Sequence, residues 1–596
     1  MRVEPKDRRK LVDAAMGRIP CDLVIKNAKM VNVFTGEIYE AEVGICDGFI
    51  AHIQCDPDHL GREEKPMEGK EYYDAEGAYL TPGFVDAHIH IESTMMTPRY
   101  FAQAVVPHGT TTVITDPHEI GNVLGVEGVK YMHECSEDLP MRQLILAPSC
   151  VPSLPGKENG GATFGTKEIN ELFELERVAG LAEVMDYYGV MNNAERMVSL
   201  LGECLGKEKF VQGHAFCIYG RELSAYACGG PMSDHEAIGG IDARDRIRIG
   251  INVDARESSI SQDIKSIINS VKDFRYFDNI TFATDDTESD DILKRGHENY
   301  IARMAVETGL DPVDAIKIGT INAAREAGIK NIGAIAPGYA ADLLVMDDLK
   351  QMEPKAVFFG GRLVAKDGRM EVEIAEKQYD VESRNTVNLG DICEENLRIK
   401  APIENGEMDC NIILFDHERG FLTEFREEKI NIKDGYVDIS ADEDLKYAVV
   451  INRYGLKTMG KAIVRGYGIK TGAVASTVAH DCHNVVVIYD KPENALKAIT
   501  RLKENAGGYV SVMNGEVLAE MKLSVAGLMS NTPIEVIAAQ SKNFKEALKT
   551  MGMTGVEFPL FVMAILPLPV VPNARLTDLG MIDIITQQFI PIFKEE

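Results

Sequence analysis

The sequence predicts an α/β protein: a (β/α)8 (TIM) barrel, a small composite β-sandwich domain made from both flanks of the barrel, and an additional C-terminal α+β domain. At 596 residues the chain exceeds a single core, since domains usually hold about 100–200 residues and a barrel about 250. Short apolar runs alternate with helical patterns in the middle of the chain, while strand-like alternation precedes and follows them. We therefore expect a first β segment with an N-terminal arm (1–80), the barrel (81–335), a second β segment (336–375) and the C-terminal domain (376–596).

The two flanks of the barrel share one sequence pattern. Residues 21–53 alternate apolar and polar side chains and are interrupted by turn signals such as Asp47-Gly48. The same alternation returns at 341–370, where Asp367-Gly368 marks a hairpin turn. This similarity predicts that the two segments form one β domain.

Eight apolar runs in the barrel region are the predicted strands. They cover 83–89, 110–116, 142–148, 180–185, 210–215, 229–233, 246–253 and 279–285. Segments between them carry helical spacing, for example 167–179 and 193–205. Eight strand–helix units in about 200–250 residues fit a (β/α)8 barrel.

The last part of the chain mixes strand-like and helix-like segments. Residues 410–416, 447–454, 462–468 and 484–490 are predicted strands, and the amphipathic stretch 492–507 is a predicted helix. This mixture is typical of an α+β domain.

Composition excludes several classes of partner. The chain has 63 basic and 93 acidic residues, a net charge of −30, which argues against nonspecific nucleic-acid binding. No stretch approaches the roughly 18–20 uncharged apolar residues of a membrane span, and the first residues lack the apolar run of a secretory signal. The 11 Cys include no CxxC pair, which disfavours a Cys-based zinc cluster and fits free thiols in a reducing cytoplasm. We therefore expect a cytoplasmic protein with no nucleic-acid or membrane partner.

The first predicted strand carries two histidines, His88 and His90, at its C-terminal end. Residues two apart on a strand point to the same side, so both imidazoles can reach one ion. Barrel active sites are built at these strand ends. Taken alone, the pair fits hydrogen-bonded core histidines equally well.

Four further strand ends carry chemically competent side chains. Glu183 ends the fourth strand, His214 the fifth and Asp285 the eighth, while His235 follows the sixth. A buried carboxylate must be paired, neutralised or bound to a cation. Nitrogen and oxygen ligands of this kind suit Zn, Mn or Fe, and a carboxylate between two groups of His can bridge ions about 3.5–4 Å apart.

This constellation resembles the amidohydrolase superfamily, as does a small β domain made from both flanks of a barrel. Within that superfamily the sequence is similar to those of the metal-dependent adenine deaminases of bacteria and archaea. The likeness covers nearly the whole chain, in TPGFVDAHIHIESTMMTP, TDPHEIGNVLG, PSCVPS, LAEVMDYYGV, VQGHA, MSDHEAI, FATDD and AVASTVAHDCHNVVVIYD. Hydantoinase- and dihydroorotase-like members use a carboxylated Lys as the bridge, whereas Glu183 occupies that position here.

The resemblance implies hydrolysis of adenine to hypoxanthine and ammonia at two divalent metal ions, with Mn²⁺ preferred over Fe²⁺ or Zn²⁺. The implied ligands are His88, His90 and Asp285 on one ion, His214 and His235 on the other, and Glu183 between them. Asp285 is also expected to accept the proton of the attacking water. Asp285 and Glu183 are thus the predicted catalytic residues.

Further polar residues lie close to these in sequence. Glu92, His118 and Glu119 are candidates for substrate binding or proton relay, and the alternative for each is to orient a metal ligand. We expect that orienting role for Asp116 and Asp286.

The C-terminal domain contains a short polar motif made of His480, Asp481 and His483. Its spacing predicts either a lid over the barrel mouth or an extra metal site, and the alternative is a hydrogen-bonded turn. We interpret the other histidines as surface or structural residues: His52, His59, His108, His133, His297 and His417.

Two other functions stay open at this point. One is a different deaminase or a cyclic amidohydrolase of the same superfamily that acts on another base. The other is a non-catalytic binding protein on the same fold, which would be marked by missing ligand residues. A homodimer is the commonest assembly for a soluble protein and is our expectation here.

Overall fold

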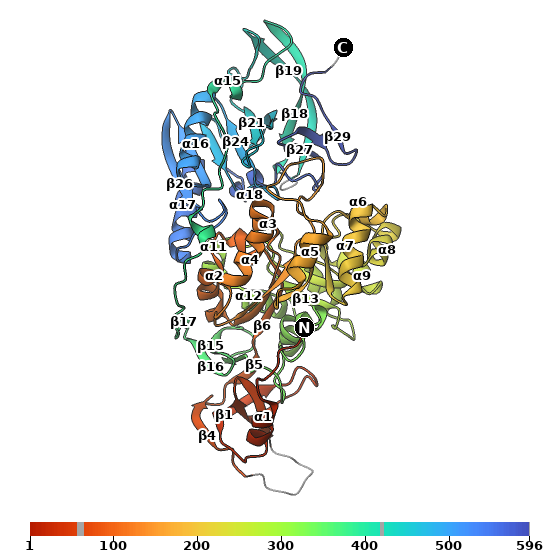
Figure 1. The fold of residues 1–596 in the computed structure, drawn as a ribbon, viewed down its shortest axis with the longest axis vertical. Coiled ribbons are helices and arrows are strands. Elements are labelled where there is room, and N and C mark those ends of the chain that lie inside the picture. Colours follow the sequence, from red (N-terminus) through yellow and green to blue (C-terminus); the bar gives the residue numbers. More distant parts are fainter. Residues whose placement is uncertain (56–64, 418–421, 595–596) are drawn as a thin grey trace.

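The structure is a computed structural model that describes residues 1–55, 65–417 and 422–594. The molecule is elongated, with a small β domain at one end, a barrel in the middle and the C-terminal domain at the other end (Figure 1). The barrel mouth faces the C-terminal domain, since side chains of both line one cavity.

Eight parallel strands form the barrel, in the predicted order. They are β6 (Phe84–Ile89), β7 (Thr110–Thr115), β8 (Arg142–Ala147), β9 (Val178–Val184), β10 (Phe210–Gly213), β11 (Ser233–Asp234), β12 (Asn252–Arg256) and β13 (Ile280–Ala283). They pair as a sheet of five, β10-β9-β8-β7-β6, and a sheet of three, β11-β12-β13. At one seam the Asp285 N–H donates to the His88 carbonyl over 2.9 Å, and at the other Met232 donates to Val211 over 2.9 Å. The curled parallel sheet confirms the predicted fold class.

Helices follow the strands and cover the outside of the curled sheet (Figure 1). The amphipathic helix α10 is a clear case, because Ile264, Ile267, Ile268 and Val271 all turn inward with at most 1% of their surface exposed. The helices of this region are α2 (Pro98–Val105), α3 (His118–Leu124), α4 (Val126–Cys135), α5 (Thr166–Phe173), α6 (Tyr187–Met191), α7 (Glu195–Gly206), α8 (Gly220–Gly229), α9 (Gly239–Arg248), α10 (Ile264–Val271), α11 (Ser289–Arg295), α12 (Glu298–Glu307), α13 (Pro312–Lys317) and α14 (Ala323–Glu326).

Several predicted boundaries are wrong, and three of them have a clear local cause. The sixth strand is not 229–233 but the two residues of β11, because α8 continues to Gly229. The seventh begins at Asn252 and not at 246, because the alternating residues at 246–248 complete α9, whose buried face includes Arg246. The helix expected over 167–179 ends at Phe173, since the apolar run from Val178 is fully buried as β9.

The two flanks of the barrel join in one β domain, as predicted. Strand β14 from the second flank pairs antiparallel with β5 from the first, and a buried cluster contains residues of both, including Val43 and Phe358. All nine strands belong to one hydrogen-bonded sheet: β1 (Cys21–Val31), β2 (Ile38–Cys46), β3 (Phe49–Cys55), β4 (Gly69–Asp74), β5 (Tyr79–Pro82), β14 (Leu343–Met346), β15 (Pro354–Phe359), β16 (Arg362–Lys366) and β17 (Arg369–Met370). Helix α1 (Arg8–Ala15) packs beside β3.

The C-terminal domain is α+β, built on a second nine-stranded sheet. Its strands are β18 (Gly406–Phe415), β19 (Thr423–Lys433), β20 (Tyr436–Asp438), β21 (Leu445–Ile451), β22 (Met459–Arg465), β23 (Ala473–Ser476), β24 (Val485–Tyr489), β25 (Gly508–Met513) and β26 (Glu516–Lys522). Helices α16 (Pro492–Glu504) and α17 (Ile534–Thr550) pack against β25 and β26, while the short α15 (Glu394–Leu397) packs on α16. Helix α18 (Pro559–Ala564) and a small sheet of β27 (Ala574–Thr577), β28 (Gly580–Asp583) and β29 (Gln588–Phe589) complete it.

Within the described ranges, none of the helices combines the length and the apolar character that crossing a bilayer requires.

Arg246 anchors the short strand β11 and offers a test of this architecture. Its buried guanidinium pairs with Asp234 and Asp242 and donates to the Ala215 carbonyl over 2.6 Å. Arg246→Met leaves two carboxylates without their cation, so we expect a loss of about 3–5 kcal/mol in the free energy of unfolding, measured by urea denaturation.

The matched control is Arg248→Met on the same helix. Arg248 is 60% exposed and forms only a 3.5 Å surface pair with Asp245, so its loss should cost less than about 1 kcal/mol. Equal stability of the two variants would contradict the anchoring role of Arg246.

Candidate active site

Six side chains predicted as ligands converge at the C-terminal ends of the barrel strands. Each is at most 9% exposed, and together they form the ligand cluster: His88, His90, Glu183, His214, His235 and Asp285. The Nε2 atoms of His88 and His90 lie 3.1 Å apart, and each lies 3.4 Å from Asp285 Oδ1. Three buried ligand atoms at this spacing can share one cation, which fits the expectation from the strand-end positions.

Glu183 lies between two groups of histidines. Its Oε2 is 2.5 Å from His214 Nδ1 and 3.2 Å from His235 Nε2. Its Oε1 faces the other way, 3.3 Å from His90 Nε2 and 3.4 Å from His118 Nδ1. The two oxygens of one carboxylate therefore address separate sets of nitrogen atoms, which is the arrangement that a bridging ligand requires.

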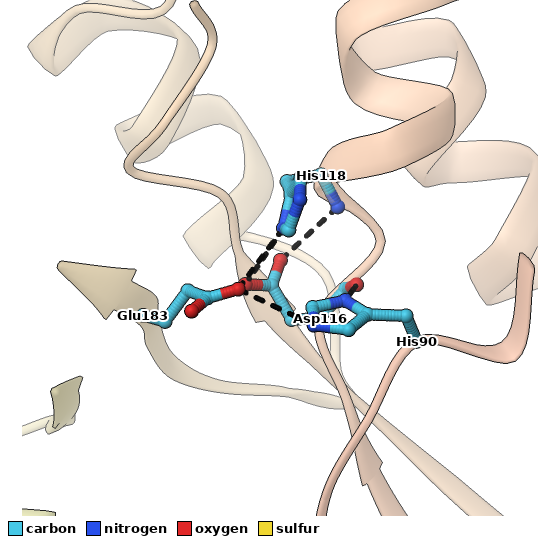
Figure 2. Close-up of side chains that lie close together, drawn as sticks. All are labelled: His90, Asp116, His118 and Glu183. Atoms are coloured by element: carbon cyan, nitrogen blue, oxygen red, sulfur yellow. Dashed lines mark hydrogen bonds and ion pairs between the residues drawn. The ribbon is translucent and has the colours of Figure 1, made fainter. Parts of the chain in front are cut away.

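His118 and Asp116 extend the cluster on the Oε1 side of Glu183, as Figure 2 shows. Asp116 Oδ2 lies 3.1 Å from His118 Nδ1, and the ligand atoms of His90, Asp116, His118 and Glu183 all lie within 4.8 Å of one another. Asp116 also positions its neighbours, because its carbonyl oxygen contacts His90 Nδ1 at 3.0 Å and its Oδ1 accepts the His118 backbone N–H at 3.0 Å.

Asp285 does not continue strand β13, contrary to the sequence expectation. The strand ends at Ala283, and Asp285 adopts a left-handed backbone with φ 51°. Strict alternation then fails, so Asp285 and Asp286 both line the cavity at the barrel mouth. Only Asp285 contacts the HxH pair; Asp286 accepts a hydrogen bond from Ser93 Oγ at 2.5 Å.

The cluster keeps its carboxylates ionised in spite of burial. Burial alone would raise the pKa of Glu183, but His214, His235 and His90 hold it well below its usual range. Burial likewise opposes ionisation of Asp285, whose pKa the neighbours His88, His90 and Arg256 keep well below normal. A negatively charged pair of carboxylates surrounded by imidazoles is suited to hold divalent metal.

Burial has the opposite outcome at Asp286 and Glu92. It raises the pKa of Asp286, and the charge of Asp285 adds to the effect. It raises the pKa of Glu92 to about 7, with Glu119 as the second cause. Glu92 Oε1 accepts the Ile120 N–H at 3.3 Å, which ties this side chain to α3 beside the cavity.

The C-terminal domain closes over the barrel mouth with the loop between β23 and β24. His480 Nδ1 lies 2.7 Å from Glu119 Oε1, and His483 Nε2 contacts Glu119 Oε2. Asp481 Oδ1 lies 3.5 Å from His118 Nε2. The three residues predicted as a lid or extra metal site thus contact the barrel, on the side of α3.

One cavity lies between these parts, and its walls differ in character. Its polar lining includes the ligand cluster except His88, together with His118, Glu119 and Asp286. The C-terminal domain contributes polar His480 and Asp481 and an apolar wall, which consists of Phe561, Ile565, Leu568 and Val571.

Sequence reasoning missed Arg256 and Gln212. Arg256 ends β12 and contacts Asp285 Oδ2 at 2.8 Å as well as Glu236; the misplaced seventh strand stopped short of it. Gln212 Oε1 lies 2.8 Å from His88 Nδ1 and therefore fixes that ring. Its signal was available, because it precedes His214 by two residues within the predicted strand 210–215, where alternate residues share a face; in the structure β10 ends at Gly213.

The remaining histidines lie away from the ligand cluster, with His59 outside the described residues. His297 is buried and contacts Thr110 Oγ1 at 2.9 Å, and His133 is buried at the end of α4. His417 contacts the carbonyl of Gly466 in the C-terminal domain. His52 and His108 are half-buried.

Comparisons with known proteins now give the family. The Amidohydrolase family matches residues 79–227 and 241–364, and the Adenine deaminase C-terminal domain matches 421–588. Adenine deaminase 2 of Carboxydothermus hydrogenoformans is 38% identical over 98% of this chain and 99% of its own, and adenine deaminase of Methanothrix thermoacetophila 37% over the same shares. A solved β-aspartyl dipeptidase from Fervidobacterium islandicum has 19% identity and a TM-score of 0.46 over 59% of this chain and 99% of that one. The chain therefore belongs to the adenine deaminase family of amidohydrolases.

Proposed function

We propose that this protein hydrolyses adenine to hypoxanthine and ammonia at the barrel mouth, with two divalent metal ions and Mn²⁺ as the preferred metal. The observation that carries the proposal is Glu183, whose two oxygens face separate histidine groups inside a buried cavity. The family and the filled ligand positions support it. They also disfavour a non-catalytic binding protein, because all six positions hold competent side chains.

The ligands divide between two sites in this proposal. His88, His90 and Asp285 would hold one ion, His214 and His235 would hold the other, and Glu183 could serve both. Divalent ions bound here would lower the pKa of water to about 7 and so supply hydroxide at neutral pH. Gln212 and the Asp116 carbonyl fix the rings of His88 and His90 in the required orientation.

Asp285 is the proposed proton acceptor. Its Oδ1 faces the HxH pair at 3.4 Å, so it lies beside the position where the attacking water would be held. Arg256 holds the other oxygen at 2.8 Å and keeps the carboxylate from turning away. Both protons of the water must be delivered: one goes to a ring nitrogen of the purine and the other, through Asp285, to the departing amine, so that hypoxanthine and ammonia form. Acid–base transfer of this kind typically contributes about 10²–10⁴-fold.

The cavity suits a flat heteroaromatic base. One wall offers hydrogen-bonding groups and the other offers the side chains of Phe561, Ile565 and Leu568, which can cover a ring face. Of the residues predicted to contact the base, His118 and Glu119 line this cavity, whereas Glu92 lines a neighbouring one with Ser93. Their contacts with adenine remain predictions.

We also propose a cytoplasmic homodimer that serves purine salvage. The 11 cysteines are all free, as a reducing compartment favours. Homodimers are the commonest assembly of soluble proteins, and size-exclusion chromatography with light scattering tests the assignment.

The substrate assay tests the function directly. Metal-loaded protein should release ammonia from adenine and much less from adenosine or cytosine, measured as kcat/KM with Mn²⁺, Fe²⁺ and Zn²⁺ in turn. Comparable values for adenosine would make the protein a nucleoside deaminase. Turnover of a cyclic amide, with none of adenine, would move the function to a cyclic amidohydrolase.

Glu183→Gln tests the bridge. The substitution keeps the shape but removes the charge between two cations, so one ion should be lost and kcat should fall with it. The measurement is metal content by mass spectrometry after gel filtration. Glu257→Gln is the matched control, since Glu257 is a buried barrel glutamate outside the ligand cluster that accepts the Ile264 N–H. Wild-type metal content in Glu183→Gln would assign the bridge to another residue.

Asp285→Asn and Asp286→Asn separate the two adjacent carboxylates. Asn at 285 retains a ligand oxygen but cannot accept a proton, so kcat should fall by about 10²–10⁴-fold with metal content nearly intact. Asp286 contacts Ser93 and not the HxH pair, so its variant should lose far less. The reverse ranking in kcat would transfer the proton-acceptor role to Asp286.

A further inference from the structure

A second group of buried ligating side chains lies where the barrel meets the C-terminal domain. His118 and Glu119 come from the start of α3, and His480 and Asp481 come from the loop between β23 and β24. His480 Nδ1 lies 2.7 Å from Glu119 Oε1, and His118 Nε2 lies 3.5 Å from Asp481 Oδ1 and 3.6 Å from Glu119 Oε1. His480 Nδ1 and Asp481 Oδ1 are 3.9 Å apart. Four ligand atoms from two domains therefore surround one point.

These residues are buried, and their polar atoms are incompletely hydrogen-bonded. The four residues are between 1% and 8% exposed. Among the described residues, His118 Nε2 has no hydrogen-bond partner, and neither has Asp481 Oδ2, the second oxygen of that carboxylate. Glu119 Oε1 is paired with His480 Nδ1 at 2.7 Å. Leaving buried charged groups unsatisfied costs several kcal/mol per group unless another ligand compensates.

Three of the four separations fit coordination better than hydrogen bonding. The fourth, 2.7 Å between His480 Nδ1 and Glu119 Oε1, is a hydrogen-bond distance and would lengthen if both atoms bound one ion. Separations of 3.5–3.9 Å are too long for direct hydrogen bonds. Ligand atoms that each lie about 2.0–2.2 Å from a common ion are roughly 3–4 Å apart. Two carboxylates at this point would also balance the charge of a divalent cation.

His483 has a different role in this group. Its Nδ1 accepts the Ala479 backbone N–H at 3.1 Å, so in the neutral ring the proton sits on Nε2. That N–H donates to Glu119 Oε2. His483 thus orients the carboxylate and leaves Oε1 directed at His480.

We propose that His118, Glu119, His480 and Asp481 bind a third divalent transition-metal ion, which joins the C-terminal domain to the barrel. Two imidazole nitrogens and two carboxylate oxygens suit Zn²⁺, Mn²⁺ or Fe²⁺. This gives His118 and Glu119 a role other than the substrate contact predicted from sequence. The site adjoins the ligand cluster, because the other ring nitrogen of His118 lies 3.4 Å from Glu183 Oε1, but the proposal does not depend on the deaminase reaction.

Crystals of the full-length protein grown with Mn²⁺ test the site. Anomalous difference maps at the manganese edge should show a peak among these four side chains, in addition to any at the ligand cluster. A map with peaks at the ligand cluster alone would overturn the proposal. A third peak in a protein that does not deaminate adenine would uphold it and refute only the proposed function.

Metal content of variants gives a second readout. His480→Asn should bind about one equivalent of Mn²⁺ less than the wild type, while His133→Asn, a buried histidine of α4 outside both groups, should match the wild type. Equal content in His480→Asn and wild type would contradict the proposal. If His480→Asn lost all metal through misfolding, the anomalous map of the wild type would decide.

Discussion

The structure depends on how the buried charge of Glu183 is compensated. A carboxylate that is 2% exposed, at the mouth of a barrel, is unfavourable unless cations or protonated groups surround it. Histidines that follow β6, β10 and β11 provide those groups, namely His90, His214 and His235. They reach Glu183 because the parallel sheet curls, so that the ends of these strands and of β9 line one cavity. The chemistry of the site therefore requires the curvature of the sheet.

The same residues close the barrel and contribute to the site. The hydrogen bond from the Asp285 N–H to the His88 carbonyl joins the last strand to the first, and the same two residues contribute ligand atoms. Arg256 holds Asp285 from the neighbouring strand β12, and Gln212 holds His88 from β10, at 2.8 Å in each case. Displacement of one strand at this seam would move both a hydrogen bond of the sheet and the position of a ligand.

Much of the fold and several ligand positions could be predicted from sequence, because the C-terminal ends of the strands in a barrel all meet at one mouth. Position on a strand was enough to bring together His88, His90 and Glu183. It was not enough for Asp285, whose left-handed backbone is set by tertiary contacts, nor for Arg256, which depended on the exact start of β12. Local patterns also misplaced the sixth and seventh strands, because alternation at 246–248 is compatible with the end of an amphipathic helix.

Contacts between the C-terminal domain and the barrel were harder still to predict from sequence. Spacing within the C-terminal domain indicated only that His480, Asp481 and His483 form a polar turn, a lid or a metal site. Their partners Glu119 and His118 lie more than 350 residues earlier, and docking of two independently folded sheets selects that pairing. No periodicity along the chain encodes which faces of two domains meet.

The cavity has an apolar wall formed by Phe561, Ile565, Leu568 and Val571. This wall affects the orientation in which a planar ligand can bind. A planar molecule with one polar edge can enter the cavity in two orientations related by a half-turn. In one, its edge meets hydrogen-bonding side chains; in the other, the edge faces hydrocarbon and loses those bonds at about 1–3 kcal/mol for each unsatisfied group. Two such groups would favour a single orientation by roughly 30-fold or more. The C-terminal domain thereby selects the direction in which a flat ring lies, without a single hydrogen bond of its own from that wall.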